Sequence, residues 1–118
     1  EDPNCGYCKR FEKELQGVNN VTVYTFLYPI LSPDSVEKSR NIWCAKDPGK
    51  EWTEHMTKGK DAPAASASCD VSAVQRNMEF GRKYKITGTP TIFFANGTRV
   101  PGAITGVELE KRIKAAGS

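Results

Sequence analysis

Two cysteines separated by two residues, Cys5 and Cys8, open a segment with helical periodicity. Cys8, Phe11 and Leu15 recur at spacings of three and four, which predicts a helix over residues 5–16 with one apolar face. Few features constrain a fold as strongly, because both sulfurs then lie within one turn of a helix start. A pair in this position can bind a metal, form a structural disulfide or exchange electrons.

The chain has two further cysteines, Cys44 and Cys69. Four cysteines allow three disulfide connectivities, and only one of them keeps Cys5 paired with Cys8. A distant pair such as Cys44 and Cys69 would have little use as a disulfide in a reducing compartment. The cysteine content therefore favours an oxidising compartment.

Length and charge exclude several classes of function. With 118 residues, the chain is most simply one domain with its own hydrophobic core. Its net charge of +3 is too small to indicate nucleic acid or an anionic membrane as the main partner. No apolar run approaches the length of a membrane span.

The remaining pattern predicts an α/β chain. Residues 21–28 carry β-branched and aromatic side chains on both faces, as in a strand buried inside a sheet. Ser32-Pro33-Asp34 is a typical helix start and opens a block of helices that extends to about Tyr84. A hairpin over residues 91–100 and a final helix after Thr105 complete the order. Within the helical block we expect Val36, Trp43 and Trp52 to be buried.

Two readings of the close cysteine pair do not involve electron transfer. Zinc coordination would need two more ligands, usually a second close pair. Cys44 and Cys69 stand far apart, and the only histidine, His55, is expected to be a surface or helix-packing residue. An inert Cys5–Cys8 disulfide would close a very short loop and constrain little of the unfolded chain. A zinc-binding structural module remains an alternative.

The local surroundings favour a redox pair. Asn4 is a good N-cap, so Cys5 falls in the first helical turn, where unpaired N–H groups and the helix dipole stabilise a negative charge. Lys9 and Arg10 add positive potential, which favours the reactive thiolate form of Cys5. Cys8, one turn further, is expected to be more buried. Cys5 is therefore the candidate nucleophile, and Cys8 the thiol that resolves a mixed disulfide.

A second motif, Thr87-Gly88-Thr89-Pro90-Thr91, directly precedes a predicted strand. The combination of a C-x-x-C helix start with this strand entry resembles the thioredoxin-like oxidoreductases. In that family the proline is cis and packs beside the active disulfide. The resemblance implies that the backbone around Thr89 and Pro90 binds an extended substrate segment.

Five motifs in order make the resemblance closer. They are Asp2-Pro3-Asn4-Cys5-Gly6-Tyr7-Cys8, Trp43-Cys44-Ala45-Lys46-Asp47, Ser68-Cys69-Asp70, Gly88-Thr89-Pro90 and Asn96-Gly97-Thr98-Arg99-Val100-Pro101-Gly102. Together they resemble the catalytic domain of the DsbC/DsbG-type periplasmic disulfide isomerases over nearly the whole chain. The Gly6-Tyr7 dipeptide is more similar to the DsbC branch.

This resemblance implies a thioredoxin-like fold over residues 1–118, with a helical insertion over about 33–84. It implies that Cys5–Cys8 is the redox pair, that Cys44–Cys69 is a permanent structural disulfide, and that no metal or other cofactor is needed. The expected substrate-binding residues are Thr89, Pro90, Tyr7 and Gly6. A non-catalytic chaperone or binding domain with the same fold is the other alternative.

The resemblance also implies partners and a place of action. We expect misfolded or misoxidised secreted proteins as substrates, a membrane electron donor of the DsbD type, and the bacterial periplasm as the location. The full-length family members are homodimers, and a monomer is compatible with the segment present here. No nucleic-acid partner is expected.

The sequence departs from the family at its start. Family members have a central strand immediately before the active-site motif and an N-terminal dimerisation domain, and neither is encoded in this chain. We therefore expect residues 21–28 and 91–95 to lack their middle neighbour and to expose pairing edges. Because isomerase and chaperone activity in the family depend on the dimer, this segment is expected to retain oxidoreductase chemistry.

Overall fold

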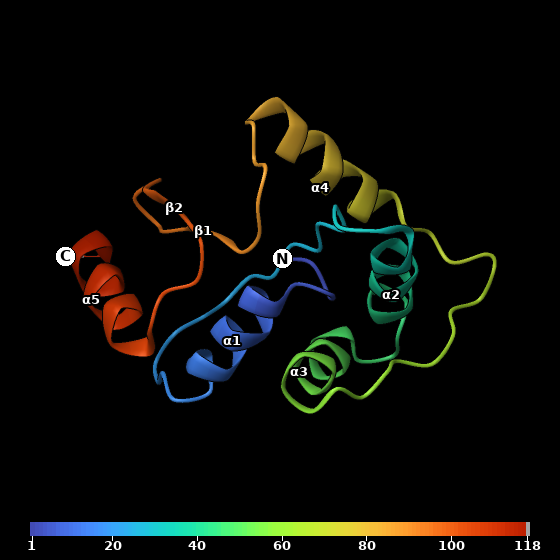
Figure 1. Cartoon of the computed structure of the whole chain (residues 1–118), viewed down its shortest axis with the longest axis horizontal. Helices are drawn as coiled ribbons and strands as arrows, with labels where there is room; N and C mark the ends of the chain where they lie inside the picture. Colours follow the sequence, from blue (N-terminus) through green and yellow to red (C-terminus); the bar gives the residue numbers. More distant parts are fainter. Residues whose placement is uncertain (118) are drawn as a thin grey trace.

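The computed structural model describes residues 1–117. Within this range the chain forms five helices and a two-stranded antiparallel sheet. The helices are α1 (Gly6–Leu15), α2 (Pro33–Trp43), α3 (Pro48–Lys58), α4 (Ser72–Lys83) and α5 (Gly106–Gly117), and the strands are β1 (Thr91–Phe93) and β2 (Arg99–Pro101). In Figure 1, α2 and α3 lie on one side of α1, and the β1–β2 hairpin and α5 lie on the other. The element order agrees with the predicted α/β class.

Helix α1 occupies the middle of the molecule and separates two apolar clusters. It packs against α3 on one side and α5 on the other. The first cluster consists of Cys5, Cys8, Leu27, Ile42, Trp52, Met56 and Val74. The second is built on Phe11, Val18 and Leu109. Because the two cysteines belong to the first cluster, the packing of the core fixes their positions directly.

The start of α1 differs from the prediction. The N-cap is Cys5, whose sulfur accepts a hydrogen bond from the Cys8 N–H at 3.2 Å. Asn4, the predicted cap, instead points its side chain to Asp34 and Ser35 at the beginning of α2. A sulfur therefore takes the place that a hydroxyl, carboxylate or amide oxygen usually occupies at a helix N-terminus.

Residues 21–28 were predicted to form a buried strand. In the structure they run as an extended segment that belongs to no sheet (Figure 1). Glu1 makes the hydrogen-bond pattern of a parallel pair with this segment, since its N–H₃⁺ donates to Phe26 O at 3.0 Å and its carbonyl accepts from Tyr28 N at 2.8 Å. The side chains of Tyr24 and Phe26, in the same segment, are exposed. A largely apolar groove of about 850 Å³ separates the segment from β1. Among residues 1–117, β1 pairs with β2 and residues 21–28 belong to no sheet.

Helix α2 buries a different face from the one predicted. Ser32 caps it by accepting from Ser35 N, and Pro33 occupies the first turn, as the sequence indicated. Its fully buried positions are Ser35, Ser39 and Ile42, whereas Val36 and Trp43 are about half exposed. Small serine side chains let α2 approach α3 and the loop of residues 2–4, called the active-site loop below, which leaves Val36 and Trp43 outside.

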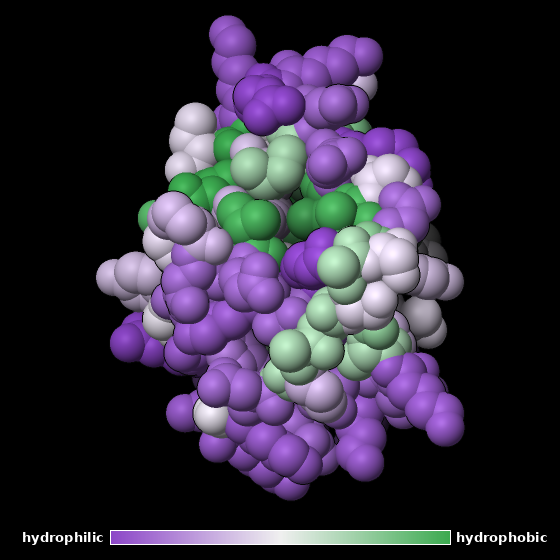
Figure 2. Space-filling model, turned by 90° about the vertical axis from the view of Figure 1, so that its right-hand side faces the viewer, coloured by the Kyte–Doolittle hydropathy of each residue, from purple (hydrophilic) through white to green (hydrophobic). Residues whose placement is uncertain are grey.

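Apolar residues also reach the surface near α2. Figure 2 views the side of the molecule on which α2, α3 and the 59–70 loop lie, and it shows apolar residues gathered at the centre of this face, ringed by hydrophilic ones. Leu31, just before α2, and Val36 are among the exposed apolar side chains.

No helix within residues 1–117 has the length and apolar character of a membrane span.

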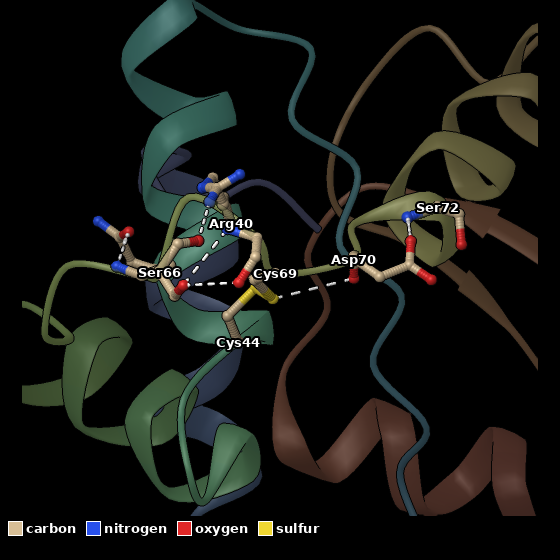
Figure 3. Close-up of a disulfide and its surroundings, with 9 residues drawn as sticks. Arg40, Cys44, Ser66, Cys69, Asp70 and Ser72 are labelled. Atoms are coloured by element: carbon tan, nitrogen blue, oxygen red, sulfur yellow. Dashed lines mark hydrogen bonds between the residues drawn. A yellow bond between two sulfur atoms is a disulfide. The ribbon is translucent and has the colours of Figure 1, made fainter.

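A disulfide joins Cys44, at the end of α2, to Cys69, with Cα atoms 6.2 Å apart and a sequence separation of 25 (Figure 3). The loop before Cys69 makes two further contacts with α2. The Arg40 guanidinium donates to the Ser66 carbonyl, and Ala65 N donates to the Asn41 side chain at 2.9 Å. The disulfide and these contacts hold the long loop between α3 and α4 against α2.

Candidate active site

Cys5 and Cys8 are both free thiols at the start of α1. Cys5 is 5% exposed and Cys8 is completely buried. Their different depths follow from the helix, because Cys5 precedes the first turn and Cys8 lies one turn into the apolar cluster. Only Cys5 offers any surface to a second molecule.

The Thr89–Pro90 peptide lies directly against Cys5. This peptide bond is cis, and Pro90 is fully buried. The Cys5 thiol donates to the Thr89 carbonyl at 3.3 Å, although 84 residues separate the two. The fold thus brings together the two motifs that the sequence analysis singled out.

The two sulfurs have different electrostatic surroundings. Burial raises the pKa of the Cys8 thiol strongly, and its hydrogen bond to Cys5 raises the pKa further. Hydrogen bonds from the Asp2 backbone and the Thr89 side chain act in the opposite direction. The raised pKa favours the protonated thiol form of Cys8.

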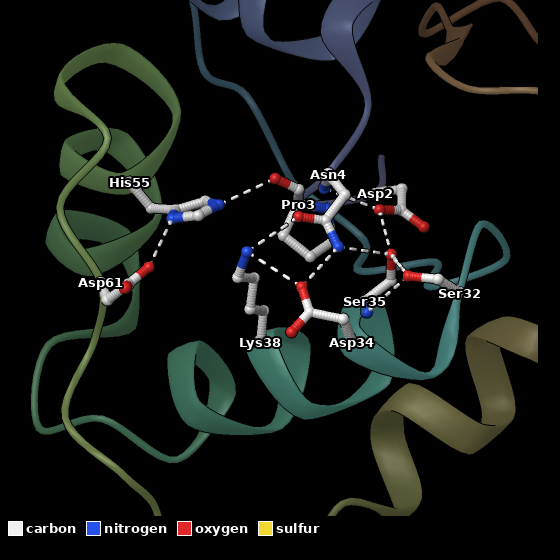
Figure 4. A network of polar contacts seen from close by, with 9 residues as sticks. All are labelled: Asp2, Pro3, Asn4, Ser32, Asp34, Ser35, Lys38, His55 and Asp61. Carbon is white, nitrogen blue, oxygen red and sulfur yellow. Dashed lines mark hydrogen bonds and ion pairs between the residues drawn. The ribbon is translucent and has the colours of Figure 1, made fainter.

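Asp2 holds the loop in front of the cysteines. Its fully buried carboxylate accepts hydrogen bonds from Asn4 N at 2.7 Å, Ser35 Oγ at 2.8 Å and Leu31 N at 3.0 Å. Its backbone carbonyl accepts from Cys5 N at 3.1 Å. Asp2 therefore links the backbone of Cys5 to the start of α2, whose Ser35 is drawn with Asp2 in Figure 4.

Asn4 and Pro3 extend this network to the helical block. The Asn4 side chain donates to Asp34 and accepts from Lys38 Nζ, both at 3.0 Å. His55, on α3, is buried and lies with Nε2 2.8 Å from the Pro3 carbonyl (Figure 4). Sequence reasoning placed His55 at the surface or in helix packing and missed this contact with the active-site loop. The only signal was its spacing of three from the buried Trp52.

Tyr7 and Gly6, between the two cysteines, face outward. Tyr7 is 62% exposed, and the Arg10 guanidinium lies 5.4 Å from its ring centroid. A Cβ added at Gly6 would meet nothing within 4 Å apart from its chain neighbours and the backbone of α1. Gly6 and Tyr7 therefore form an exposed surface between the two buried cysteines.

The cysteines do not form a four-ligand metal site. Cys44 and Cys69 are bonded to each other, while Cys5 and Cys8 belong to the apolar cluster at α1. Within residues 1–117, no group of three or more His, Cys, Asp or Glu side chains is placed to hold a metal ion. The chemistry that this arrangement supports is thiol–disulfide exchange at Cys5.

Curated proteins similar to this chain carry one kind of name. The chain is 52% identical over 113 residues to the probable thiol:disulfide interchange protein DsbC of Bordetella bronchiseptica, covering 96% of the chain and 39% of that protein. It is 34% identical over 105 residues to the thiol:disulfide interchange protein DsbC of Escherichia coli K12, covering 86% and 43%. The chain thus spans about two fifths of the length of these relatives.

Solved structures and a family profile agree with these names. A disulfide interchange protein from Neisseria gonorrhoeae superposes with a TM-score of 0.90 at 38% identity, covering 98% of this chain and 83% of that one. The catalytic domain of Proteus mirabilis ScsC superposes with a TM-score of 0.73 at 25% identity, covering 98% and 79%. The family described as a thioredoxin-like domain matches residues 1–117. The chain therefore belongs to the thioredoxin-like family and, within it, to the disulfide interchange proteins.

Proposed function

We propose that this chain is the catalytic domain of a thiol–disulfide oxidoreductase that reduces or isomerises disulfides in misoxidised proteins of the bacterial periplasm. The observation that carries the proposal is the Cys5 thiol, at the N-terminus of α1 and 3.3 Å from the carbonyl that precedes cis-Pro90. DsbC is the name of the curated relatives, and their longer chains support the assignment of residues 1–118 to one domain of a larger protein.

The reaction begins with attack of the Cys5 thiolate on one sulfur of a substrate disulfide. The substrate S–S bond breaks, its electron pair leaves with the second substrate sulfur, and a Cys5–substrate mixed disulfide forms. In isomerisation, another substrate thiolate attacks the mixed disulfide and releases Cys5 as a thiolate, with no net change in redox state. In reduction, Cys8 attacks Cys5 Sγ, closes the Cys5–Cys8 disulfide and releases the substrate as a dithiol.

The surface around Cys5 is the proposed substrate site. In this proposal the backbone of Thr89 and Pro90 pairs with an extended substrate segment beside the nucleophile. Tyr7 packs on substrate side chains, and the open space at Gly6 admits the substrate backbone. The exposure of Tyr7 and the free space at Gly6 support these assignments.

The proposed partners follow from the same chemistry. Reduction of a substrate leaves Cys5–Cys8 oxidised, so an electron donor of the DsbD type must restore the dithiol. The proposed role of Cys44–Cys69 is structural: it ties down the helical insertion over about 33–84. In the longer protein we expect a homodimer that presents two such domains to a misfolded substrate.

Differential alkylation tests the two cysteine pairs. The protein is poised at a mild reducing potential, alkylated and analysed by mass spectrometry. Cys5 and Cys8 should be labelled first, while Cys44 and Cys69 remain bridged. Simultaneous labelling of all four cysteines would contradict the proposed division of roles.

Two single variants test the order of attack, each serving as the control for the other. Cys8→Ala should accumulate mixed disulfides with a scrambled multi-disulfide substrate, because the resolving thiol is absent. Cys5→Ala should form none. Reactivation of the scrambled substrate by Cys5→Ala protein would show that Cys5 is not the nucleophile.

A further inference from the structure

The chain reaches Cys5 through a tight turn whose shape is not fixed by its own sequence. Residues 2–5 form this turn, which is closed by the hydrogen bond from Cys5 N to the Asp2 carbonyl at 3.1 Å. Pro3 and Asn4 are its two central residues. Proline at the first central position suits both type I and type II turns, and asparagine at the second tolerates the positive φ that type II requires. The sequence is therefore compatible with two turns that differ in the orientation of the Pro3–Asn4 peptide.

In the structure, side chains hold this central peptide from both sides. Asn4 does not have a positive φ, so the type II turn is not formed. The N–H of the peptide donates to the Asp2 carboxylate at 2.7 Å, which is typical of a turn that begins with aspartate. Its carbonyl, that of Pro3, lies 2.8 Å from His55 Nε2 (Figure 4). Rotation of the peptide into the other turn would break both hydrogen bonds.

His55 reaches the turn from another helix and carries the proton that the contact needs. It lies on the buried face of α3, together with Trp52 and Met56, and is 4% exposed. Because a carbonyl oxygen can only accept, Nε2 is the nitrogen that donates. The other nitrogen, Nδ1, lies 3.7 Å from Asp61 Oδ1. The neutral Nε2–H tautomer and the imidazolium both offer this donor, so the contact does not depend on the charge of His55.

We propose that His55 is a positioning residue for the redox site, because it selects the turn in which Cys5 is presented. This inference rests on the proposed function of Cys5. In the observed turn, Cys5 Sγ lies 3.2 Å from Cys8 N and 3.3 Å from the Thr89 carbonyl. Without the Nε2–H donor, the central peptide loses one of its two restraints, and two interconverting turns present Cys5. Fewer molecules then hold the sulfur ready to attack, and a small displacement of a reacting atom lowers the rate strongly.

This role differs from acid–base catalysis. Within residues 1–117, no hydrogen bond joins His55 to a cysteine sulfur, and its contact with the active-site loop is made to the Pro3 carbonyl. His55 therefore acts through the backbone and neither gives nor takes a proton in the exchange. A side chain that donates from the same place but cannot titrate should replace it.

Two amide side chains of different length test the contact. In His55→Gln, the amide N–H₂ falls at about the position of Nε2 and can donate to the Pro3 carbonyl. In His55→Asn, the shorter amide reaches only about as far as Nδ1 and leaves the carbonyl without its partner. Leu109→Val, in the second apolar cluster, controls for a loss of stability away from the active-site loop. Stopped flow with Ellman's reagent measures attack by Cys5 as the first phase of thionitrobenzoate release from the reduced protein.

The first phase should slow by about three- to tenfold in His55→Asn, because Cys5 is held in place for a smaller fraction of the time. In His55→Gln and Leu109→Val it should stay within about twofold of the unaltered protein. Urea denaturation shows that each variant is folded under the conditions of the rate measurement. The Asn4 amide signal in ¹⁵N NMR spectra should split or broaden in His55→Asn and remain single in His55→Gln.

An unchanged first phase in His55→Asn, or an equal slowing in His55→Gln or Leu109→Val, would overturn the inference. Absence of any reaction at Cys5 in the unaltered protein would instead overturn the proposed function. If His55→Asn fails to fold, long-range ¹H–¹⁵N NMR spectra of the unaltered protein give the answer. His55 Nε2 should carry a proton on both sides of the histidine titration, and an unprotonated Nε2 would also overturn the inference.

Discussion

At the residue scale, the surroundings of each side chain decide its behaviour more than its type does. Cys5 and Cys8 are chemically identical and belong to one apolar cluster, yet Cys5 keeps 5% of its surface exposed and Cys8 keeps none. The same holds for histidine: His55 is buried and fixed by the Pro3 carbonyl, with Asp61 on its other nitrogen at 3.7 Å. Removal of such a buried partner leaves a polar group without compensation.

We therefore expect His55→Ala to lower the free energy of unfolding by about 1–3 kcal/mol, because the buried Pro3 carbonyl loses its partner. His55→Gln is the matched control, since its side-chain amide can still donate to that carbonyl. Urea denaturation followed by circular dichroism measures both variants. Equal losses for alanine and glutamine would show that the hydrogen bond contributes nothing measurable.

At the element scale, local patterns predicted the helices well and their surroundings poorly. The α1 periodicity and the Ser32-Pro33 start of α2 were visible in the sequence. The cap of α1 could not be predicted in this way, because the Asn4 side chain donates a hydrogen bond to Asp34, 30 positions away in sequence. The composition of residues 21–28 predicted a strand, but strand assignment requires a hydrogen-bonded neighbour that composition alone does not reveal.

A close contact between elements can be tested at Gly81, on α4. A Cβ at this position would overlap the ring of Tyr28, whose hydroxyl donates to the Ile86 carbonyl at 2.7 Å. Gly81→Ala should therefore displace Tyr28 and cost about 1–3 kcal/mol of stability, measured by thermal and urea denaturation. Gly17→Ala is the control, because its Cβ would make an ordinary contact. If Gly81→Ala were as stable as Gly17→Ala, the close packing of Gly81 against Tyr28 would be contradicted.

At the scale of the whole molecule, the site is assembled from segments that sequence distance separates. The proximity of Cys5 to Thr89 was anticipated only through the resemblance of both motifs to one family, since no local pattern links them. The burial of Glu12 against Trp52 was not predicted, because charged residues on a helix are usually solvated. The exposure of Trp43 could not be predicted either, because the buried face of α2 is set by how closely the active-site loop approaches its serines.

The Cys44–Cys69 disulfide should stabilise the whole domain. In the chain-entropy model, closing a loop across 25 residues contributes about 3–4 kcal/mol, so Cys44→Ala/Cys69→Ala should lose about that much in urea denaturation. Comparison with the reduced, unaltered protein separates loss of the bond from loss of the side chains. Unchanged stability of Cys44→Ala/Cys69→Ala would show that the disulfide does not stabilise the native state.

The contacts of residues 2–4 have a consequence for recombination among related proteins. Asp2, Pro3 and Asn4 are held by side chains of α2 and α3, so the active-site loop and the helical block form one structural unit. A chimaera that exchanges residues 33–84 alone would separate each of these partners. Exchange of the loop together with the helices preserves these contacts. Residues 1–5 and 33–84 should therefore be exchanged as one unit, despite the 27 residues between them.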